Sequence, residues 1–496
     1  METDEIIYLN KVNEVYFRLD LSPSQAMELK EHLSFYANNY KYHPQFKAGF
    51  WNGKIYMFNT RDRLLPIGLL PHFVTFCTQF KYIFVFNFDR TKEFGSSLVE
   101  DRFDKFIEAI FPADCNFYPR YYQQEGIFKA LTNKRGILQL PTGSGKSLVQ
   151  YSIIRYLLAC SEKILLIVPT VALVTQMFSD FKEYGWGDIE SHCCLVYAGQ
   201  KIENKSLVIS TWQSIYNKSS NFFKPFTALM IDECHLASGM SISNVSKNCI
   251  NAHYRIGVTG TMPKDDASKY TILGHLGPIL YTLDAKTLID EGVLSKIEIR
   301  NVIVKYPSQM CYKRKDYQEE ITDILSCSSR NKTLDYILNK VQDKSNILIL
   351  VQRIEHLKIV RDYIVDNHQK YDVYEIYGDT SPEDKELIRK NMEISENAII
   401  VSTFSSFSTG LNVKRLHHVL FYSSYKSEIK ILQSIGRGLR THETKDKVVI
   451  WDVVDDIRYQ YNKKLVNNYS YNHWKNFRLS YYEEQRFDYT NEQINI

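Results

Sequence analysis

The sequence lacks several features that would place it in a specialised class of protein. No run of apolar residues approaches the ~18 that a membrane-spanning helix needs. The N-terminal stretch METDEIIYLN is polar and acidic, which argues against a secretory signal peptide. The 9 cysteines include no C-x-x-C pair, and the adjacent Cys193 and Cys194 suit neither a disulfide nor a zinc site. We therefore expect reduced thiols in an intracellular protein.

A strong charge of one sign is also absent. The 61 Lys and Arg residues against 57 Asp and Glu give a net charge of +4, so any surface for a polyanion must be local. Repeats and low-complexity segments are missing as well. What the chain does have is size: 496 residues, 44% of them hydrophobic, suffice for about three domains with cores of their own.

Short apolar runs alternate with helical patterns over most of the chain. GILQL, KILLIVPT, SLVIST, TALMIDE and YRIGVTGT predict strands, and SNILILVQ, DVYEIYGD, NAIIVST, HHVLFYSS and KVVIWDVVD repeat the pattern. Such runs, separated by helices, are typical of parallel sheets covered on both faces. We predict an α/β fold with two tandem parallel-sheet domains at 113–295 and 296–446. An α+β accessory domain at 1–112 precedes them, and a small helical C-terminal extension at 447–496 follows.

A glycine-rich segment, LQLPTGSGKS, joins a predicted strand to a predicted helix. Its glycines free the backbone for left-handed angles, so that amides can point at the phosphates of a nucleotide. The lysine can reach the β and γ oxygens, and the following serine can ligate magnesium. Leu140 stands where the usual G-x-x-x-x-G-K-[ST] pattern begins with glycine. We predict a site for ATP and Mg²⁺ made by Thr142, Gly143, Ser144, Gly145, Lys146 and Ser147.

Two carboxylates follow the apolar strand in TALMIDECH. The carboxyl end of a strand is where ligands bind in open α/β sheets, and this strand delivers Asp232 and Glu233 there. We expect Asp232 to hold Mg²⁺, and Glu233 to accept a proton from the attacking water. Taken alone, the motif could equally be an ordinary solvated acidic turn.

A third motif, QSIGRGLR, lies in the second predicted α/β domain. On a helix, Gln433, Gly436, Arg437 and Arg440 would recur every three or four residues and share one face. Arginine at a γ-phosphate stabilises transition-state charge, which gives this face a catalytic interpretation. The alternative is a solvated basic helix face.

The order of these motifs resembles that of the superfamily 2 helicases and translocases, over about residues 118 to 440. The series is YQQ, PTGSGKS, VPTVALVTQ, STWQS, DECH, VTGT, ILVQ, VSTFSSFSTGLNV and QSIGRGLR. The resemblance implies RecA-like domains and assigns further roles: Gln123 reads adenine, Thr259 and Thr261 couple hydrolysis to domain motion, and Gly410 meets nucleotide and nucleic acid. It also implies that the phosphate backbone of nucleic acid is bound at three strand ends, whose plain alternative role is capping: Thr170, Thr211 and Thr403.

A closer resemblance, nearly end to end, is to the UvsW-type helicases of bacteriophages. It rests on YHPQFKAGFWNGKIYMFNTRDRLLPIGLL, DECHLASGMSIS, YQEEI and FSSFSTGLNVKRLHHVLF. It implies an ATP-dependent helicase for forks, junctions, single strands and RNA–DNA hybrids, active in recombination, repair and replication control. It further implies a monomer in the infected host cytoplasm, with no membrane contact, and with single-stranded-DNA-binding or recombination proteins as candidate partners.

Other functions stay open from the residues alone. An ATPase motor on another polymer, such as a polypeptide, would carry the same nucleotide motifs, and so would an ATP-driven switch that does not separate strands. A restriction-enzyme motor subunit would need an additional nuclease or partner-binding region, for which we see no room.

Two further segments are candidates for nucleic-acid contact. Residues 40–63 interleave cations with rings, among them Trp51, which suits phosphates and bases, although a β-hairpin with its rings in the core would look similar. The C-terminal extension is also basic and aromatic, and we favour a docked amphipathic helix there over a DNA clamp. We call four cations of the first segment the basic set: Lys47, Lys54, Arg61 and Arg63.

Overall fold

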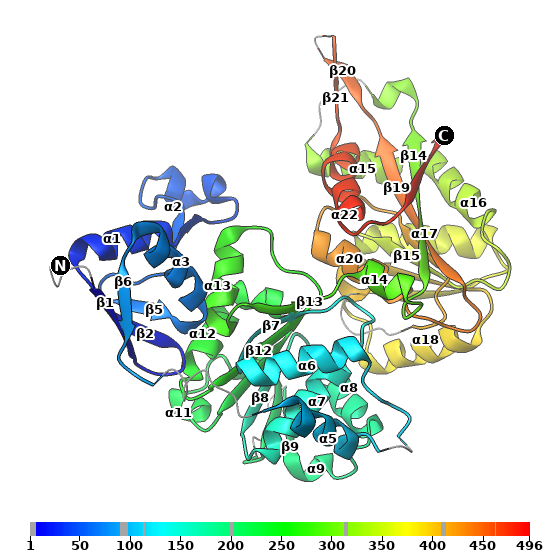
Figure 1. Cartoon of the computed structure of the whole chain (residues 1–496). Helices are drawn as coiled ribbons and strands as arrows, with labels where there is room; N and C mark the ends of the chain where they lie inside the picture. The colour runs from blue at the N-terminus through cyan, green and yellow to red at the C-terminus, as the bar shows by residue number, and fades with distance from the viewer. Residues whose placement is uncertain are drawn as a thin grey trace. The chain divides into compact units, whose positions relative to one another are not determined.

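The computed structural model describes residues 6–89, 98–112, 115–197, 203–311, 316–407, 413–461 and 463–496. The chain divides into two compact units (Figure 1). Unit 1 consists of Met1–Leu140 and Gly145–Leu283, and unit 2 of Pro141–Ser144 and Asp284–Ile496. No helix among the described residues is long and apolar enough to cross a membrane.

Unit 1 contains a seven-stranded parallel sheet. In sheet order its strands are β13 (Ile279–Thr282), β7 (Arg135–Gln139), β12 (Tyr254–Thr259), β11 (Ala228–Asp232), β8 (Ile164–Val168), β10 (Leu207–Thr211) and β9 (Cys193–Val196). The five strands predicted from the apolar runs are confirmed, whereas the short outer strands β9 and β13 were not expected. The main helices of this part are α5 (Glu100–Ile110), α6 (Tyr121–Asn133), α7 (Lys146–Ala159), α8 (Val171–Glu183), α12 (Met240–Asn248) and α13 (Asp266–Leu276).

The two faces of this sheet belong to different hydrophobic cores. Leu166 and Met230 lie in one core, while Leu165 and Leu229, each one residue earlier in its strand, lie in the other. Successive side chains of a strand point to opposite faces, so a continuous apolar run is what a sheet buried on both sides requires.

The N-terminal region forms a small mixed sheet. Its strands are, in order, β5 (Leu64–Pro66), β2 (Tyr16–Asp20), β1 (Ile6–Lys11) and β6 (Ile83–Phe86), accompanied by α1 (Pro23–His32) and α3 (Leu70–Phe80). Helix α1 begins where Ser22 and Gln25 form a reciprocal capping box, with proline in the first turn. A second, two-stranded sheet pairs β3 (Ser34–Tyr36) with β4 (Lys54–Tyr56), and the short helix α2 (Pro44–Lys47) lies between them in sequence.

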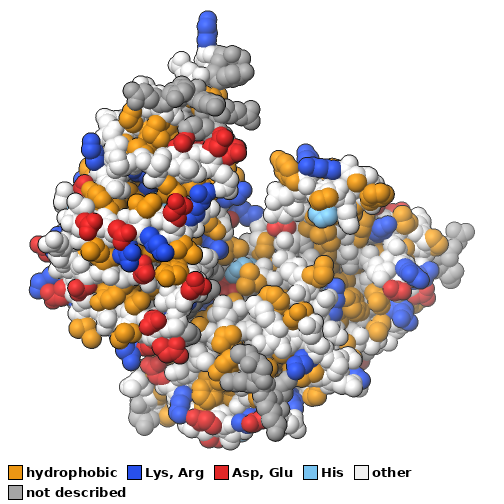
Figure 2. Space-filling view, turned by 180° about the vertical axis from the view of Figure 1, so that it is seen from behind, with side chains coloured by type: hydrophobic (Ala, Val, Ile, Leu, Met, Phe, Trp, Pro, Cys, Tyr) orange, Lys and Arg blue, Asp and Glu red, His pale blue; other side chains and the backbone are white. Residues whose placement is uncertain are grey.

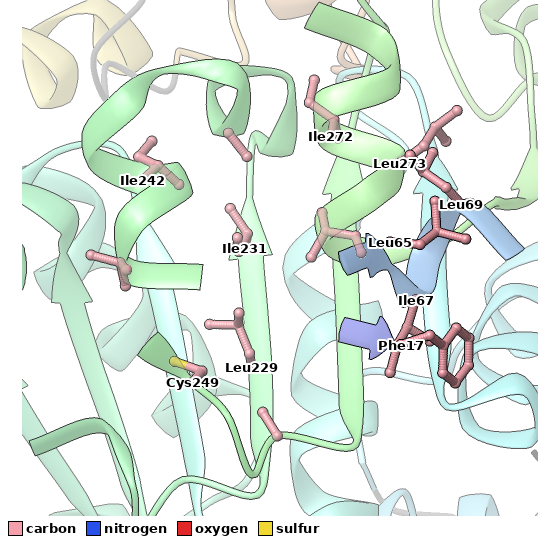
Figure 3. Packing of buried hydrophobic residues seen from close by; sticks show 14 of the residues in the cluster. Phe17, Leu65, Ile67, Leu69, Leu229, Ile231, Ile242, Cys249, Ile272 and Leu273 are labelled. Atoms are coloured by element: carbon pink, nitrogen blue, oxygen red, sulfur yellow. The ribbon is translucent and has the colours of Figure 1, made fainter. Parts of the chain in front are cut away.

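The N-terminal region shares one hydrophobic core with a face of the parallel sheet of unit 1. Figure 3 shows Phe17 and Leu65 from the N-terminal strands in the same cluster as Ile231 and Leu273. The approach is close at Gly68, where a Cβ atom would lie 2.0 Å from the backbone oxygen of Leu273 in α13. The N-terminal region is thus built into unit 1 and is not attached by a linker alone.

Unit 2 contains a second seven-stranded parallel sheet. Its strands are β16 (Asp372–Ile376), β17 (Ala398–Thr403), β15 (Ile347–Val351), β18 (His418–Phe421), β19 (Lys447–Asp456), β14 (Lys296–Lys305) and β22 (Tyr489–Asn495). Strands β15 to β19 are confirmed, and the α/β class with two tandem parallel-sheet domains is confirmed with them. Its helices include α14 (Ala285–Asp290), α15 (Tyr317–Ser326), α16 (Lys332–Leu338), α17 (Ile354–Asn367), α18 (Pro382–Ile394), α19 (Phe404–Phe407) and α20 (Glu428–Gly438).

The C-terminal extension is part of unit 2 and contributes β19 and β22 to its sheet. After the hairpin of β20 (Tyr459–Tyr461) and β21 (Lys464–Val466) it forms α21 (Tyr469–His473), a π-helical turn at Trp474–Arg478 and α22 (Leu479–Glu484). The guanidinium of Arg478 is fully buried 2.9 Å from the equally buried carboxylate of Asp452. The helical part of the extension is therefore docked onto strand β19. The last strand, β22, completes the sheet by pairing in parallel with β14.

Candidate functional site

The glycine-rich loop connects β7 to α7, as predicted. Gly143 and Gly145 have φ of 89° and 79°, left-handed values that suit glycine. Lys146 is the first residue of α7, so its side chain starts from the helix N-terminus, where the partial positive charge favours a phosphate. Its Nζ atom lies 3.8 Å from Oε1 of Glu233.

Gln123 lies against the same loop. Its Nε2 donates a long hydrogen bond of 3.4 Å to the carbonyl oxygen of Gly145, and its Oε1 accepts 2.8 Å from the backbone N–H of Arg120. A Cβ atom at position 145 would approach Nε2 to 2.4 Å, so the end of the Gln123 side chain would have to move. Position 145 therefore needs glycine chiefly for its backbone angle.

Asp232 ends strand β11 and is buried. Gln150 is a fully buried residue in α7, and its Nε2 atom donates a hydrogen bond of 2.8 Å to Oδ1 of Asp232. Burial, and then the neighbouring carboxylate of Glu233, raise the pKa of Asp232 to about 6. The carboxylate is thus held in place but lacks a full counter-charge, the state expected of a cation ligand.

Glu233 follows with a strained backbone. Its φ of 46° is left-handed, which costs about 1–3 kcal/mol for a residue with a side chain. Its Oε2 atom lies 3.3 Å from Nδ1 of His235 and 3.5 Å from the Thr259 hydroxyl, while these two groups are 3.0 Å apart. The Thr259 hydroxyl also lies 2.9 Å from the carbonyl oxygen of Thr261. The sheet thus brings together the predicted catalytic base, Glu233, and both predicted coupling threonines.

The oxygen donors near Asp232 fit Mg²⁺, which prefers carboxylate, hydroxyl and water oxygens. Ser147 is next to Lys146 in α7, and its hydroxyl lies 2.8 Å from the hydroxyl of Tyr184. The Oε1 atom of Gln150 is buried and has no hydrogen-bond partner in the described part of the chain. An unpaired buried acceptor beside Asp232 suits a water molecule of a hydrated cation.

The strand-end threonines lie at the carboxyl edges of their sheets. Thr211 ends β10, and Thr170 lies two residues after the end of β8, the strand next to β11. Both threonines therefore lie at the edge that carries Asp232. Neighbouring strands are about 4.8 Å apart, which places β7 and β10 roughly 19 Å apart. The Thr170 hydroxyl caps α8 by accepting from Leu173 N, and the Thr211 hydroxyl lies 2.9 Å from that of Ser214. Capping thus accounts for Thr170.

In unit 2, helix α20 carries Gln433, Gly436 and Arg437 but ends at Gly438. Arg440 lies beyond the helix, so the prediction that all these residues share one helix face is wrong for Arg440. Beyond the helix end, the carbonyl oxygens of Leu439 and Arg440 accept hydrogen bonds from the backbone N–H and the hydroxyl of Ser295, at 2.7 Å and 3.1 Å. Thr403 ends β17, and its hydroxyl bonds to Ser406 at 2.8 Å. Gly410 falls outside the described residues.

Lys445 holds the end of α20, a role the sequence did not indicate. Its buried ammonium donates to the carbonyl oxygens of Gly438 at 2.7 Å and Leu416 at 3.1 Å. Burial, and then the charge of Arg440, lower its pKa to about 8. No motif reveals the contact of Gln150 with Asp232 or that of Tyr184 with Ser147, because each joins residues distant in sequence.

The basic set divides into two pairs. Lys54 pairs with Glu31 at 2.7 Å and Arg63 with Asp20 at 3.4 Å, whereas Lys47 and Arg61 are exposed without such an ion pair among the described residues. The neighbouring rings are not in the core: Tyr42 and Phe50 are 76% and 88% exposed. Trp51 is half-buried, with its Nε1 donating to the Lys54 carbonyl oxygen. Figure 2 shows hydrophobic and basic side chains next to each other on the N-terminal region.

Comparisons with known proteins agree with this architecture. Residues 116–264 match the model of the type III restriction enzyme res subunit, and residues 329–442 match the helicase conserved C-terminal domain. A fragment of an HsdR subunit of a type I restriction enzyme from Vibrio vulnificus has the same fold at 18% identity, with a TM-score of 0.57 over 79% of this chain and 71% of its own. The fold and the site together define a superfamily 2 helicase or translocase.

The N-terminal region narrows the class further. Residues 10–87 match the model of the N-terminal domain of DNA helicase UvsW. The ATP-dependent DNA helicase uvsW of Enterobacteria phage T4 is 33% identical over 97% of this chain and 98% of its own length. The crystal structure of T4 UvsW covers 99% of both chains at 31% identity, with a TM-score of 0.51. The chain belongs to the UvsW family of helicases.

Proposed function

We propose that this protein is an ATP-dependent DNA helicase that remodels forks, drives branch migration and unwinds RNA–DNA hybrids. The supporting observation is that Lys146, Asp232 and Glu233 lie together at one edge of a parallel sheet, in a chain similar to the T4 helicase over 97% of its length. The protein would act as a monomer in the cytoplasm of an infected bacterium. Its partners would be single-stranded-DNA-binding or recombination proteins.

The residues of unit 1 divide the work of hydrolysis. Lys146 neutralises charge on the β- and γ-phosphates, and Gln123 recognises adenine. Glu233 accepts a proton from the water that attacks the γ-phosphate, and His235 and Thr259 hold its carboxylate in position. Because Thr259 also contacts the Thr261 carbonyl, a change at Glu233 would be passed on to the chain that follows β12.

Mg²⁺ would be held by the Ser147 hydroxyl and the Asp232 carboxylate. When bound, it neutralises phosphate charge and orients the γ-phosphate. Gln150 fixes the Asp232 carboxylate by a hydrogen bond of 2.8 Å, and its amide oxygen would accept a hydrogen bond from water on the cation. The Tyr184 hydroxyl, 2.8 Å from that of Ser147, would position the serine for the cation.

Unit 2 supplies charge for the transition state. Arg437 and Arg440 stabilise the transferring phosphoryl group, and Gln433 assists them. Gly410 lies in a segment that contacts both the nucleotide and the nucleic acid. In this assignment residues 113–295 and 296–446 are the two motor domains. Residues 1–112 form an accessory domain for duplex or junction, through the basic set and Trp51, and 447–496 is an extension of the second motor domain. The strand-end threonines bind phosphates of the tracked strand.

The test is ATP hydrolysis measured with single-stranded DNA, a fork, an R-loop, RNA and an unfolded polypeptide, together with strand separation on the fork and the R-loop. We expect stimulation by nucleic acid, separation of strands, and loss of both in Lys146→Ala. Stimulation by polypeptide alone would point to another polymer. Stimulation by DNA without any strand separation would point to an ATP-driven switch.

A further inference from the structure

The hairpin of β20 and β21 leaves the carboxyl edge of the sheet in unit 2. Strand β19 ends at Asp456, the hairpin begins at Tyr459, and its two strands pair only with each other. Figure 1 shows the pair extending away from the body of unit 2. A two-stranded hairpin by itself is marginally stable in water, so this one must be fixed by its base.

The base of the hairpin is firmly held. The guanidinium of Arg458 donates to both carboxylate oxygens of Asp456 at 2.8 Å each, and it lies 3.9 Å from the centre of the Tyr471 ring. Asn468 accepts from the backbone N–H of Ile457 and donates to the Asp455 carbonyl oxygen. A bidentate ion pair stacked on a ring fixes direction as well as position.

The far end has the opposite character. Lys463 and Lys464 are exposed, and Leu465 is 56% exposed although it is apolar. Neither lysine forms an ion pair within the described part of the chain. Figure 2 shows Lys or Arg side chains at the end of the corresponding projection. Two free cations suit phosphates, and a projecting leucine is one of the side chains that proteins insert between base steps.

The hairpin leaves the same edge of the sheet as one of the predicted phosphate contacts. Thr403 ends β17 at this carboxyl edge, and β17 and β19 are separated by β15 and β18. Three inter-strand spacings set β19 roughly 14 Å to the side of β17, and β19 also runs past the level of Thr403 before the hairpin begins. A strand bound at Thr403 would thus lie on the edge from which the hairpin projects.

We propose that the β20–β21 hairpin is a strand-separating pin, in which Leu465 packs against the end base pair of a duplex arm while Lys463 and Lys464 bind its phosphates. The inference rests on the proposed function, because it needs a motor that draws one strand past the edge of unit 2. A duplex end or branch point is the partner that combines a stacked apolar surface with dense negative charge.

The test uses the full chain and two variants of the pin. Leu465→Ser removes the wedge, and the double variant Lys463→Asn, Lys464→Gln removes the charges. Asparagine is chosen at 463 because that residue has a left-handed φ of 61°. The matched control, Lys370→Gln with Lys447→Gln, also removes two exposed lysines, but these lie at or just before the amino ends of β16 and β19, at the opposite edge.

We expect Leu465→Ser to slow fork unwinding by about tenfold, the factor that stacking of one base-pair step is worth. The double lysine variant should flatten the log–log salt dependence of fork binding by about 1.8, or about 0.9 per phosphate contact. Stimulation of ATP hydrolysis by short single strands should stay unchanged in both, which also shows that they fold. The control should behave as wild type.

Unchanged fork unwinding in both pin variants would overturn the inference. So would a loss of single-strand-stimulated ATP hydrolysis as large as the loss of unwinding, because the hairpin would then be part of the surface that binds the single strand. A hairpin that binds a protein partner instead would leave unwinding by the purified variants intact. If wild type shows no stimulation by nucleic acid, the proposed function itself fails.

Discussion

Replacing Gly68 by alanine should loosen the N-terminal region from the parallel sheet of unit 1. The new Cβ atom would lie 2.0 Å from the Leu273 oxygen, and 2.8 Å from the Gly274 oxygen and the Gly277 nitrogen. Ordinary contact begins at 3.4 Å, so the N-terminal sheet and α13 must move apart by more than 1 Å. Overpacking costs about 1–3 kcal/mol, and we expect the upper end because all three atoms are backbone.

The assay is thermal unfolding of the full chain, with hydrogen exchange of β5 and α13 to locate the change. A loss of about 3 kcal/mol should lower the midpoint for unit 1 by roughly 6–12 °C. Gly187→Ala is the matched control, because a Cβ atom there meets nothing within 4 Å. If both variants melt together, with equal protection of α13, the close contact at Gly68 does not hold the two parts together.

Four other substitutions or conditions test the site. Glu233→Gln should still bind ATP but hydrolyse it at least about 100-fold more slowly, because an amide cannot take the proton; unchanged turnover would contradict this role. Mg²⁺-dependent hydrolysis should fall about tenfold per pH unit below pH 6, where Asp232 takes up a proton, and a flat profile across about pH 5–8 would count against Asp232 as a ligand. The raised pKa of Asp232 also means that this group stabilises the fold at low pH, and that the stabilisation is lost as pH rises through about 6. Arg437→Ala and Arg440→Ala should each reduce turnover, by up to about 10³-fold, more than they weaken ATP binding, whereas weak binding with normal turnover would indicate a ground-state contact. Neutralising the basic set should spare basal hydrolysis and weaken junction binding, mainly through the two members without an ion pair; unchanged junction affinity and salt slope would place the branch-binding surface elsewhere.

The strands of both parallel sheets could be predicted because burial on both faces leaves a continuous apolar run. Strand β14 escaped the prediction because Lys296, Glu298 and Arg300 interrupt its apolar residues with charge. Strand β14 forms because it pairs with β19 and β22, two segments far along the chain, and this pairing cannot be seen in the local sequence. The helical prediction for Arg440 failed for a similar reason: α20 ends at Gly438, and the next two carbonyl oxygens bond to Ser295, a residue far away in the sequence.

The candidate site divides in the same way. Lys146, Asp232 and Glu233 could be predicted because their chemistry is written in contiguous motifs at strand ends. Gln150 could not, because it is a polar residue on a helix whose partner is 82 positions away. The attachment of the N-terminal region through a shared core was equally invisible, since apolar residues in a sequence do not say which sheet they will cover.

The pairing of β14 with β22 affects how the protein is made. Residues of unit 1 run from the beginning of the chain to Leu283, apart from one short loop, so this unit can fold while synthesis continues. Unit 2 is completed later, because the outer edge of β14 has no neighbour until Tyr489–Asn495 leaves the ribosome. During that interval β14 is an open edge strand, the kind of surface on which nascent chains associate wrongly. Emergence of Tyr489–Asn495 is therefore the step that covers this edge and protects the second sheet from aggregation.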